Sequence, residues 1–331
     1  MKLPNIVILA TGGTIAGIAG STTTTVGYKA AAITVETLIE MVPEIETIAN
    51  ISGHQVVQIS SQDMNNDIWL SLGKKVNELL SNPNIDGVVI THGTDTMEET
   101  AYYLHLTVNS EKPVVLVGAM RPSTAMSADG PNNLYNAVVL AGSTNARRKG
   151  VLVVMNDSIY SAREVTKLST FMTDAFQAPG LGALGYIQSN IAHLYKEPIG
   201  LHTITSRFSK AEIKELPKID IAYGYANVTR VAIDAFAANK SKGIIYAGTG
   251  NGSLTGEITE ALIEARRSGI IIVRSSRVGS GLVARNGEAN DDELDFIVSN
   301  TLNPQKARVL LLLALTLTTD TKEIQQMFYD Y

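Results

Sequence analysis

The sequence predicts an α/β fold with two domains, and three observations support this class. The chain has 331 residues, enough for one large or two medium domains with substantial cores. Short apolar runs rich in β-branched residues alternate with segments of helical periodicity, which is the pattern of βα units. Residues 197–217 are irregular, with two prolines, a glycine and scattered charges, and are the best candidate for a linker. We therefore expect an N-terminal α/β domain over 1–196 and a C-terminal α/β domain over 218–331.

The first predicted strand, 6–10, ends in a glycine turn around which we expect the rest of the chain to be organised. The strand is apolar and β-branched, as buried parallel strands are. Gly12 and Gly13 follow it, and glycine permits backbone angles and close approaches that a Cβ forbids. Thr14 then lies just beyond the carboxyl end of the strand, where open α/β sheets bind their ligands. A tight turn whose threonines only cap backbone groups is the simpler alternative.

A second unit of the same design is predicted near residue 90. The apolar strand 87–90 leads into the polar loop 91–96, and a helix follows over 97–106. A threonine, Thr94, again comes directly after a glycine at the start of a helix. At this point Thr94 and Asp95 are equally well explained as helix caps.

The remaining predicted elements continue the alternation of strands and helices. In the N-terminal part we expect helices over 35–42, 68–80 and 133–141, and strands over 55–60, 113–117 and 151–155. In the C-terminal part we expect strands over 219–223, 243–247 and 269–273, and two closing helices that begin near Pro304 and Asp320. The polar, glycine-flanked residues 21–28 are predicted to form a mobile loop.

Polar side chains that follow the predicted strands are candidates for ligand binding. Ser61, Gln62 and Asp63 come directly after the strand 55–60, and their hydroxyl, amide and carboxylate groups together could bind a zwitterion. Capping of the next helix by Ser61 or Asp63 is equally plausible. Lys167 lies in a polar stretch, where most lysines are solvated surface charges.

The composition is that of a globular protein and excludes several functions. Hydrophobic residues make up 45% of the chain and charged residues 18%, which is not the balance of a disordered protein. The net charge of −5 is mild, and no basic stripe or aromatic platform indicates a nucleic-acid partner. Because the chain has no cysteine, disulfides, thiol nucleophiles and thiolate metal sites are excluded. The longest strongly apolar run, 309–317, is far shorter than the roughly 20 residues of a membrane helix, and no membrane partner is expected.

The sequence lacks the motifs that several other catalytic mechanisms require. The glycines on either side of Ser280 flank it without spacers, so the Gly-x-Ser-x-Gly elbow of serine hydrolases is missing. The five histidines have no metal-ligand spacing, and no metal is expected. In the glycine-rich loop 248–253, Ser253 stands where dinucleotide binding requires a third glycine, and no cofactor is expected. Hydroxyl nucleophiles activated by a nearby base remain.

Five segments together resemble signature loops of the bacterial L-asparaginases, in particular the exported type II class. They are residues 10–17, 91–96, 118–122, 127–131 and 302–308, in order along nearly the whole chain. The resemblance implies a larger N-terminal domain with a mixed sheet flanked by helices, and a smaller C-terminal domain with a parallel, flavodoxin-like sheet. It also implies hydrolysis of L-asparagine to L-aspartate and ammonia, without a cofactor.

The resemblance assigns catalytic roles to two groups of residues. Thr14 matches the nucleophile that forms a covalent acyl-enzyme, and Tyr28 matches a flexible lid tyrosine. Thr94, Lys167 and Asp95 match a second cluster of hydroxyl, lysine and carboxylate. These roles agree with physical chemistry, because a neutral threonine is a poor nucleophile and needs a proton acceptor nearby. A lysine whose pKa is lowered by burial is one candidate for that acceptor.

The resemblance also assigns the binding of a small zwitterionic amide. Ser61, Gln62 and Asp95 match the residues that hold the α-carboxylate and the α-ammonium of the substrate. Glu288 matches a carboxylate that the neighbouring subunit donates in a homotetramer. The resemblance implies that Glu288 both binds the substrate and takes part in catalysis. Ala119 matches the residue whose carbonyl faces the substrate amide.

Two features distinguish this chain from the strictest family members. Ser253 stands where many asparaginases have an asparagine, and serine there resembles the members that also hydrolyse L-glutamine, so glutaminase side activity is expected. The run 6–10 is too short for a signal peptide, although the exported class usually carries one. We expect a periplasmic protein from the resemblance, with a cytoplasmic one as the alternative.

The main alternative function is a non-catalytic amino-acid-binding protein on the same two-domain frame. Such a protein needs the zwitterion-binding residues, but it does not need Thr14, Thr94 and Lys167 together. An amidase acting on a larger substrate is a second alternative, and the compact zwitterion-binding set argues against it.

Overall fold

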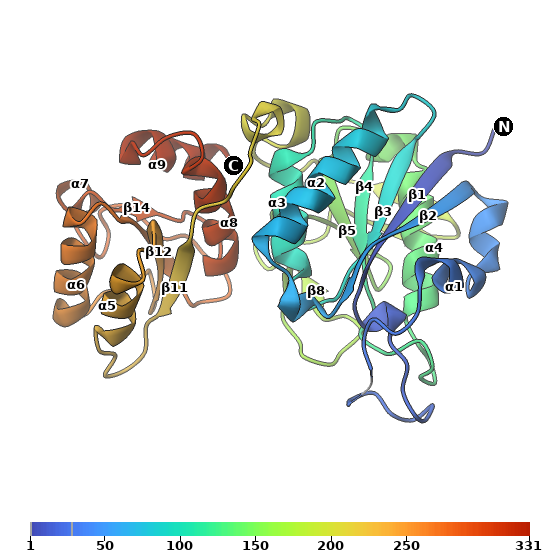
Figure 1. The fold of residues 1–331 in the computed structure, drawn as a ribbon, viewed down its shortest axis with the longest axis horizontal. Helices are drawn as coiled ribbons and strands as arrows, with labels where there is room; N and C mark the ends of the chain where they lie inside the picture. Colours follow the sequence, from blue (N-terminus) through green and yellow to red (C-terminus); the bar gives the residue numbers. More distant parts are fainter. Residues whose placement is uncertain (1, 28) are drawn as a thin grey trace. The chain divides into compact units, whose positions relative to one another are not determined.

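The computed structural model describes residues 2–27 and 29–331 of the chain. The chain forms two compact units, Met1–Ala211 and Glu212–Tyr331 (Figure 1). The division falls within the segment 197–217 that the sequence suggests as a linker. That segment begins in the first unit, where it contains the short 3-10 helices η5 (Thr203–Thr205) and η6 (Phe208–Lys210).

The N-terminal unit is built on a mixed sheet of eight strands in the order β10-β9-β6-β5-β4-β3-β1-β2. Its strands are β1 (Asn5–Gly12), β2 (Asn50–Ile59), β3 (Gly87–Thr91), β4 (Val114–Val117), β5 (Val151–Met155), β6 (Ser158–Ser161), β9 (Gly185–Gln188) and β10 (Ile191–Leu194). The strands β2, β1, β3, β4 and β5 run parallel, whereas β6, β9 and β10 form an antiparallel extension. A separate two-stranded ribbon pairs β7 (Thr166–Lys167) with β8 (Phe176–Gln177).

Helices cover both faces of this sheet. They are α1 (Val35–Glu40), α2 (Asn66–Ser81), α3 (Met97–Thr107) and α4 (Gly130–Ala141), with short 3-10 helices η1 (Thr14–Ala16), η2 (Pro43–Thr47), η3 (Ser61–Asp63) and η4 (Thr144–Ala146). Figure 1 shows α2 and α3 on one side of the strands and α1 and α4 on the other. Alternate residues of β1, such as Ile6 and Ile8, pack in one core with Leu38 of α1 and Leu134 of α4. Because both faces are covered, β3, β4 and β5 are buried along their whole length.

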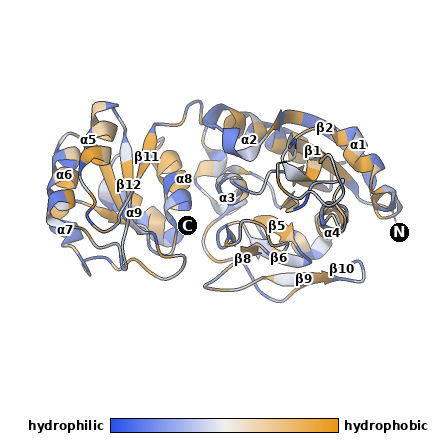
Figure 2. Cartoon of the chain, turned by 90° about the horizontal axis from the view of Figure 1, so that it is seen from below, coloured by the Kyte–Doolittle hydropathy of each residue, from blue (hydrophilic) through white to orange (hydrophobic). Residues whose placement is uncertain are grey.

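The C-terminal unit is a parallel four-stranded sheet in the order β11-β12-β13-β14. Its elements are β11 (Ile219–Tyr223), α5 (Val231–Ala238), β12 (Gly243–Gly248), α6 (Gly256–Arg267), β13 (Ile271–Ser276), α7 (Asp291–Leu294), β14 (Ile297–Val298), α8 (Pro304–Ala314) and α9 (Thr321–Asp330). In Figure 2 the central strands are mostly hydrophobic, whereas α6 shows hydrophobic and hydrophilic residues. The predicted fold class is confirmed: a larger mixed sheet flanked by helices and a smaller parallel sheet.

The order of the parallel strands determines where the functional loops meet. β1 lies between β2 and β3, with Ala10 in register with Thr91, and β4 lies beside β3 with Val117 opposite Thr91. Because these four strands are parallel, the loops that follow them leave the sheet at one edge.

No helix among residues 2–27 and 29–331 is long and apolar enough to cross a membrane.

Candidate active site

The two threonine loops meet at this edge because glycine lets their backbones touch. Gly13 has a φ of 80°, in the left-handed region that favours glycine, and a Cβ built on it would overlap the backbone of Gly93. A Cβ on Gly93 would in turn lie 2.6 Å from the Ser61 hydroxyl oxygen. The loops after β1, β3 and β2 therefore pack backbone to backbone, and their next residues, Thr14 and Thr94, are brought to the same place.

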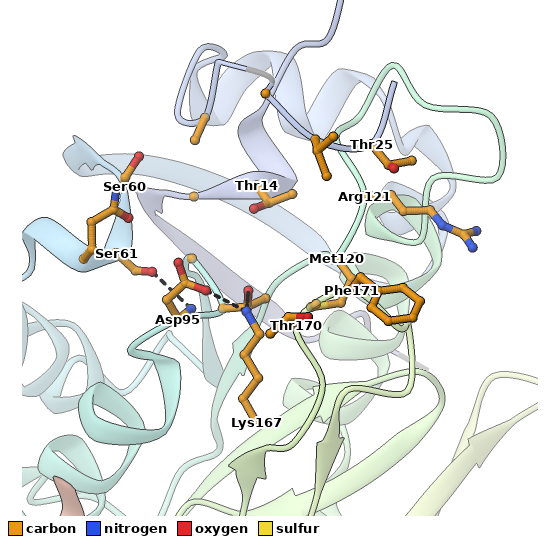
Figure 3. Close-up of a pocket in the computed structure, with 17 residues that line it drawn as sticks. Thr14, Thr25, Ser60, Ser61, Asp95, Met120, Arg121, Lys167, Thr170 and Phe171 are labelled. Carbon is orange, nitrogen blue, oxygen red and sulfur yellow. Dashed lines mark hydrogen bonds and ion pairs between the residues drawn. The ribbon is translucent and has the colours of Figure 1, made fainter. Parts of the chain in front are cut away.

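A cavity of about 560 Å³ opens over these loops (Figure 3). The predicted site residues on its wall are Thr14, Ser61, Gln62, Thr94, Asp95 and Lys167. Figure 3 shows the Thr14 side chain facing the same cavity as the Lys167 ammonium group. Thr25, Arg121, Thr170 and Phe171 also line the wall, although the sequence analysis assigned no site role to them. The first two lie in loops after β1 and β4, and the other two follow Lys167.

Lys167 is the centre of the polar contacts in this cavity. Its Nζ donates a hydrogen bond to Thr94 Oγ1 at 2.9 Å and pairs with Asp95 Oδ1 at 2.6 Å. Its backbone N–H donates to Glu98 Oε2 at 2.8 Å, and the same oxygen accepts the Thr166 hydroxyl at 2.6 Å. Glu98 is buried in the first turn of α3. The lysine is thus held at its backbone and at its ammonium group by one short segment, and it is not a solvated surface charge.

The helix-capping alternatives for the loop residues are wrong. The N-cap of α2 is Asn65, whose side chain accepts the Ile68 N–H. The N-cap of α3 is Thr96, so neither Thr94 nor Asp95 caps that helix. Ser61 instead accepts the backbone N–H of Asp95 at 3.2 Å, and this bond ties the loop after β2 to the loop after β3.

Asp129 supports the loop after β4 in a way that the sequence did not indicate. It occupies the N-cap position of α4, but its side chain does not cap that helix. The carboxylate accepts the backbone N–H groups of Met120 and Arg121, each at 2.9 Å. Because a peptide unit is planar, these bonds also fix the direction of the Ala119 carbonyl. Ala119 is fully buried, and its neighbour Met120 is the residue that lines the cavity.

His92 is a buried, neutral part of the same loop. Burial lowers its pKa to about 4, against an ordinary value of 6.5. Its Nδ1 lies 2.7 Å from the Gly93 carbonyl oxygen, and since a carbonyl only accepts, Nδ1 carries the proton. In the part of the chain that the structure describes, no cluster of His, Asp or Glu side chains could hold a metal ion.

Two further predicted residues contact each other. Ser253 and Glu288 belong to the C-terminal unit, where the Ser253 hydroxyl donates to Glu288 Oε2 at 3.2 Å. The predicted lid tyrosine, Tyr28, lies outside the described residues. The structure thus brings Thr14, Thr94 and Lys167 to one cavity and joins Ser253 to Glu288 within the second unit.

Fold and site together define a two-unit α/β protein with a cavity that is lined by two threonine loops and a lysine. Residues 5–200 match the family model "Asparaginase, N-terminal", and residues 218–328 match "Glutaminase/Asparaginase C-terminal domain". The chain therefore belongs to the asparaginase family, and the resemblance to bacterial L-asparaginases inferred from the loops is confirmed.

Three known proteins illustrate this relationship. The chain is 51% identical to the "Glutaminase-asparaginase" of Pseudomonas fluorescens biotype A, over all of this chain and 91% of the relative. It is 50% identical to the "Probable L-asparaginase periplasmic" of Haemophilus influenzae, over 99% of this chain and 93% of the relative. The crystal structure of a "Probable Cytoplasmic L-asparaginase" from Campylobacter jejuni matches with a TM-score of 0.96 at 51% identity, covering 99% of this chain and 100% of that one.

Proposed function

We propose that the chain hydrolyses L-asparagine to L-aspartate and ammonia through an acyl-enzyme formed on a threonine. The observation that carries this proposal is the hydrogen bond between Lys167 Nζ and Thr94 Oγ1 in a cavity that Thr14 also lines. A hydroxyl beside an amine is an arrangement that can accept a proton from an attacking hydroxyl or water. A protein that only binds an amino acid has no use for it.

The proposed reaction has two halves. Thr14 Oγ1 attacks the side-chain carbonyl carbon of the substrate, its proton passes through the neighbouring groups to the leaving nitrogen, and the C–N bond breaks to release ammonia. Water then attacks the acyl carbon, one of its protons passes by way of Thr94 and Lys167 to Thr14 Oγ1 as the ester bond to Thr14 breaks, and L-aspartate leaves with the Thr14 hydroxyl restored. Backbone N–H groups of the glycine turns are the proposed donors to the oxyanion, each worth about 10²–10³ in rate.

The rest of the cavity supports recognition of an amino acid. Asp95 is the proposed partner of the substrate α-ammonium, and Ser61 and Gln62 are the proposed partners of the α-carboxylate. All three lie on the cavity wall, on the loops that follow β2 and β3. Ala119 is proposed to direct its carbonyl at the substrate amide, and Tyr28 to act as a lid.

We extend the proposal to L-glutamine as a second substrate and to a homotetramer with shared sites. Ser253 is the residue that suggests the glutaminase activity, and a relative at 51% identity is named for both activities. In the tetramer, Glu288 and Ser253 of one subunit complete the site of its neighbour. The periplasm is the proposed compartment, with the cytoplasm as the alternative, since relatives are named for each. Cell fractionation decides between the two.

Ammonia release from L-asparagine tests the proposed activity in one assay. We expect stoichiometric ammonia and L-aspartate from the purified protein with no added metal or cofactor. Tight binding of L-asparagine without ammonia release would instead indicate the amino-acid-binding protein.

A further inference from the structure

Arg274 and Asp291 form a fully buried ion pair in the C-terminal unit. Arg274 lies in β13 and Asp291 is the first residue of α7, and both side chains are 0% exposed. The pair is bidentate, with Nε donating to Oδ1 at 2.6 Å and Nη2 donating to Oδ2 at 2.7 Å. Such a pair is costly to bury, so its geometry is expected to serve a purpose.

The other donors of the guanidinium bind two different loops. Nη1 donates to the carbonyls of Asn251 and Gly252 at 3.2 and 3.0 Å, and Nη2 donates to the carbonyl of Ala284 at 3.1 Å. Together with the two bonds to Asp291, these occupy all five N–H donors of the arginine. Lysine has three donors and no planar fork, so it cannot make the same set of bonds.

Both loops carry residues of the proposed substrate site. Ser253 directly follows Gly252, one of the two bound carbonyls, and Glu288 lies between Ala284 and Asp291. A Cβ on Gly252 would lie 3.0 Å from Arg274 Nη1, so the loop backbone rests against the guanidinium. The contact between Ser253 and Glu288, 3.2 Å long, therefore spans two segments that Arg274 joins.

Two backbone hydrogen bonds reinforce this connection. Asn251 Oδ1 accepts the backbone N–H of Ala284 at 2.9 Å, and the Asp291 carboxylate accepts that of Asn286 at 2.8 Å. The segment before Glu288 is thus held by backbone bonds that lead back to the ion pair. Glu288 itself is exposed, so its placement depends on the backbone that carries it.

We propose that Arg274 and Asp291 are a positioning pair for substrate binding, which fixes Ser253 and Glu288 relative to each other. The inference rests on the proposed function, in which those two residues contact the substrate. Displacing them impairs the binding of the α-ammonium group and changes the discrimination between L-asparagine and L-glutamine. A misplacement of about 1 Å can cost about 10²-fold in rate.

The experiment compares the tetrameric variants Arg274→Lys and Asp291→Asn with wild type. We expect KM for L-asparagine to rise about tenfold or more in both, a smaller change in kcat, and an altered ratio of the two kcat/KM values for L-glutamine and L-asparagine. The matched control is Arg266→Lys, which alters the partly exposed pair of Arg266 with Asp295 in the same unit. It should leave KM and the ratio unchanged.

The outcomes separate the inference from the proposed function. If wild type and Arg266→Lys release ammonia but Arg274→Lys and Asp291→Asn show only a lower melting temperature, with KM and the ratio unchanged, the pair is merely structural and the inference is overturned. If Arg274→Lys does not fold, the KM and ratio of Asp291→Asn decide alone. If wild type releases no ammonia, the proposed function fails, and this is seen before any variant is compared.

Discussion

Lys167 Nζ donates a hydrogen bond to Thr94 Oγ1 at 2.9 Å, joining residues that are 73 positions apart in the sequence. The bond depends on two independent pieces of structure. Thr94 is placed by the glycine contact at the end of β3, and Lys167 is placed by the Glu98 carboxylate, which accepts its backbone N–H. Proximity and orientation of this kind are one way in which a fold contributes to catalysis.

Removing either threonine hydroxyl should abolish turnover. We expect Thr14→Ala and Thr94→Ala to lower kcat by about 10³-fold or more, because in the proposed mechanism each removes a group that acts on the reacting atoms. Ammonia release measures this, and circular dichroism checks folding. Serine at either position is the control, since it keeps the hydroxyl. Activity within tenfold of wild type in an alanine variant would mean that the hydroxyl of that threonine is not needed for the reaction.

Lys167→Met should be nearly as damaging. It removes the amine beside Thr94, and the loss of general-base assistance corresponds to about 10²–10⁴ in rate. Lys214, whose side chain is 79% exposed, offers a control, and Lys214→Met should leave kcat unchanged. A mild effect of Lys167→Met would mean that another group accepts the proton.

Glu98→Ala should lower kcat through the position of Lys167. The carboxylate holds the Lys167 N–H and the Thr166 hydroxyl, so its loss frees the ribbon that carries the lysine. We expect a loss of about 10–10²-fold, since misplacement by about 1 Å can cost that much. Glu98→Gln, which keeps an acceptor oxygen, should recover part of the rate, whereas a merely structural role predicts lower stability and unchanged kcat in both variants.

Ser253→Asn should shift the preference toward L-asparagine. The larger amide side chain replaces the hydroxyl that donates to Glu288. In the proposed shared site it narrows the space for a substrate one methylene longer. Such a difference is worth about 1–3 kcal/mol, or roughly 10–200-fold in specificity. The ratio of kcat/KM for the two substrates is the measurement, and Ser253→Ala separates the loss of the hydroxyl from the added bulk. An unchanged ratio in Ser253→Asn would mean that this position has no role in substrate selectivity.

Stability should fall as the pH is lowered from about 6.5 to about 4 because of His92. Its folded pKa is about 4, below the unfolded value of 6.5, so in this range the unfolded chain binds a proton that the folded chain does not. The effect is absent above pH 6.5 and reaches about 3 kcal/mol at pH 4, at 1.36 kcal/mol for each pKa unit. Unfolding at pH 7.5, 5.5 and 4.5 should show a smaller slope in His92→Gln than in wild type. Equal slopes would mean that His92 is protonated in the folded protein.

The sequence predicted the parallel part of the fold because its strands are continuous apolar runs bounded by glycines and polar loops. β3 and β5 are buried throughout, and a continuous apolar run of this kind can be recognised in the sequence without knowing which strand it pairs with. The antiparallel strands were missed. β9 and β10 have only four residues each, too few for a periodic pattern, and their pairing depends on turns at Ser189 and Asn190, which adopt a positive φ.

The candidate site was predictable only in part from local pattern. Thr14 and Thr94 follow glycines at strand ends, and this position alone indicated them. Lys167 has no such signal, because its role arises from a contact with Thr94 across the fold, and only the family resemblance pointed to it. Glu98 belongs to a predicted first helical turn and Asp129 to a loop matched by the resemblance. Neither was given a role in the site, yet their carboxylates hold the backbone of site loops.

The contact between Gly13 and Gly93 limits how this enzyme can be redesigned. A methyl group at Gly13 would push the two threonine loops apart, so no side chain is tolerated at this position. Phe171 on the wall is 74% exposed, so replacing its side chain should disturb the packing little. Libraries that seek new amide substrates should therefore vary the rim around Phe171 and leave the glycines untouched.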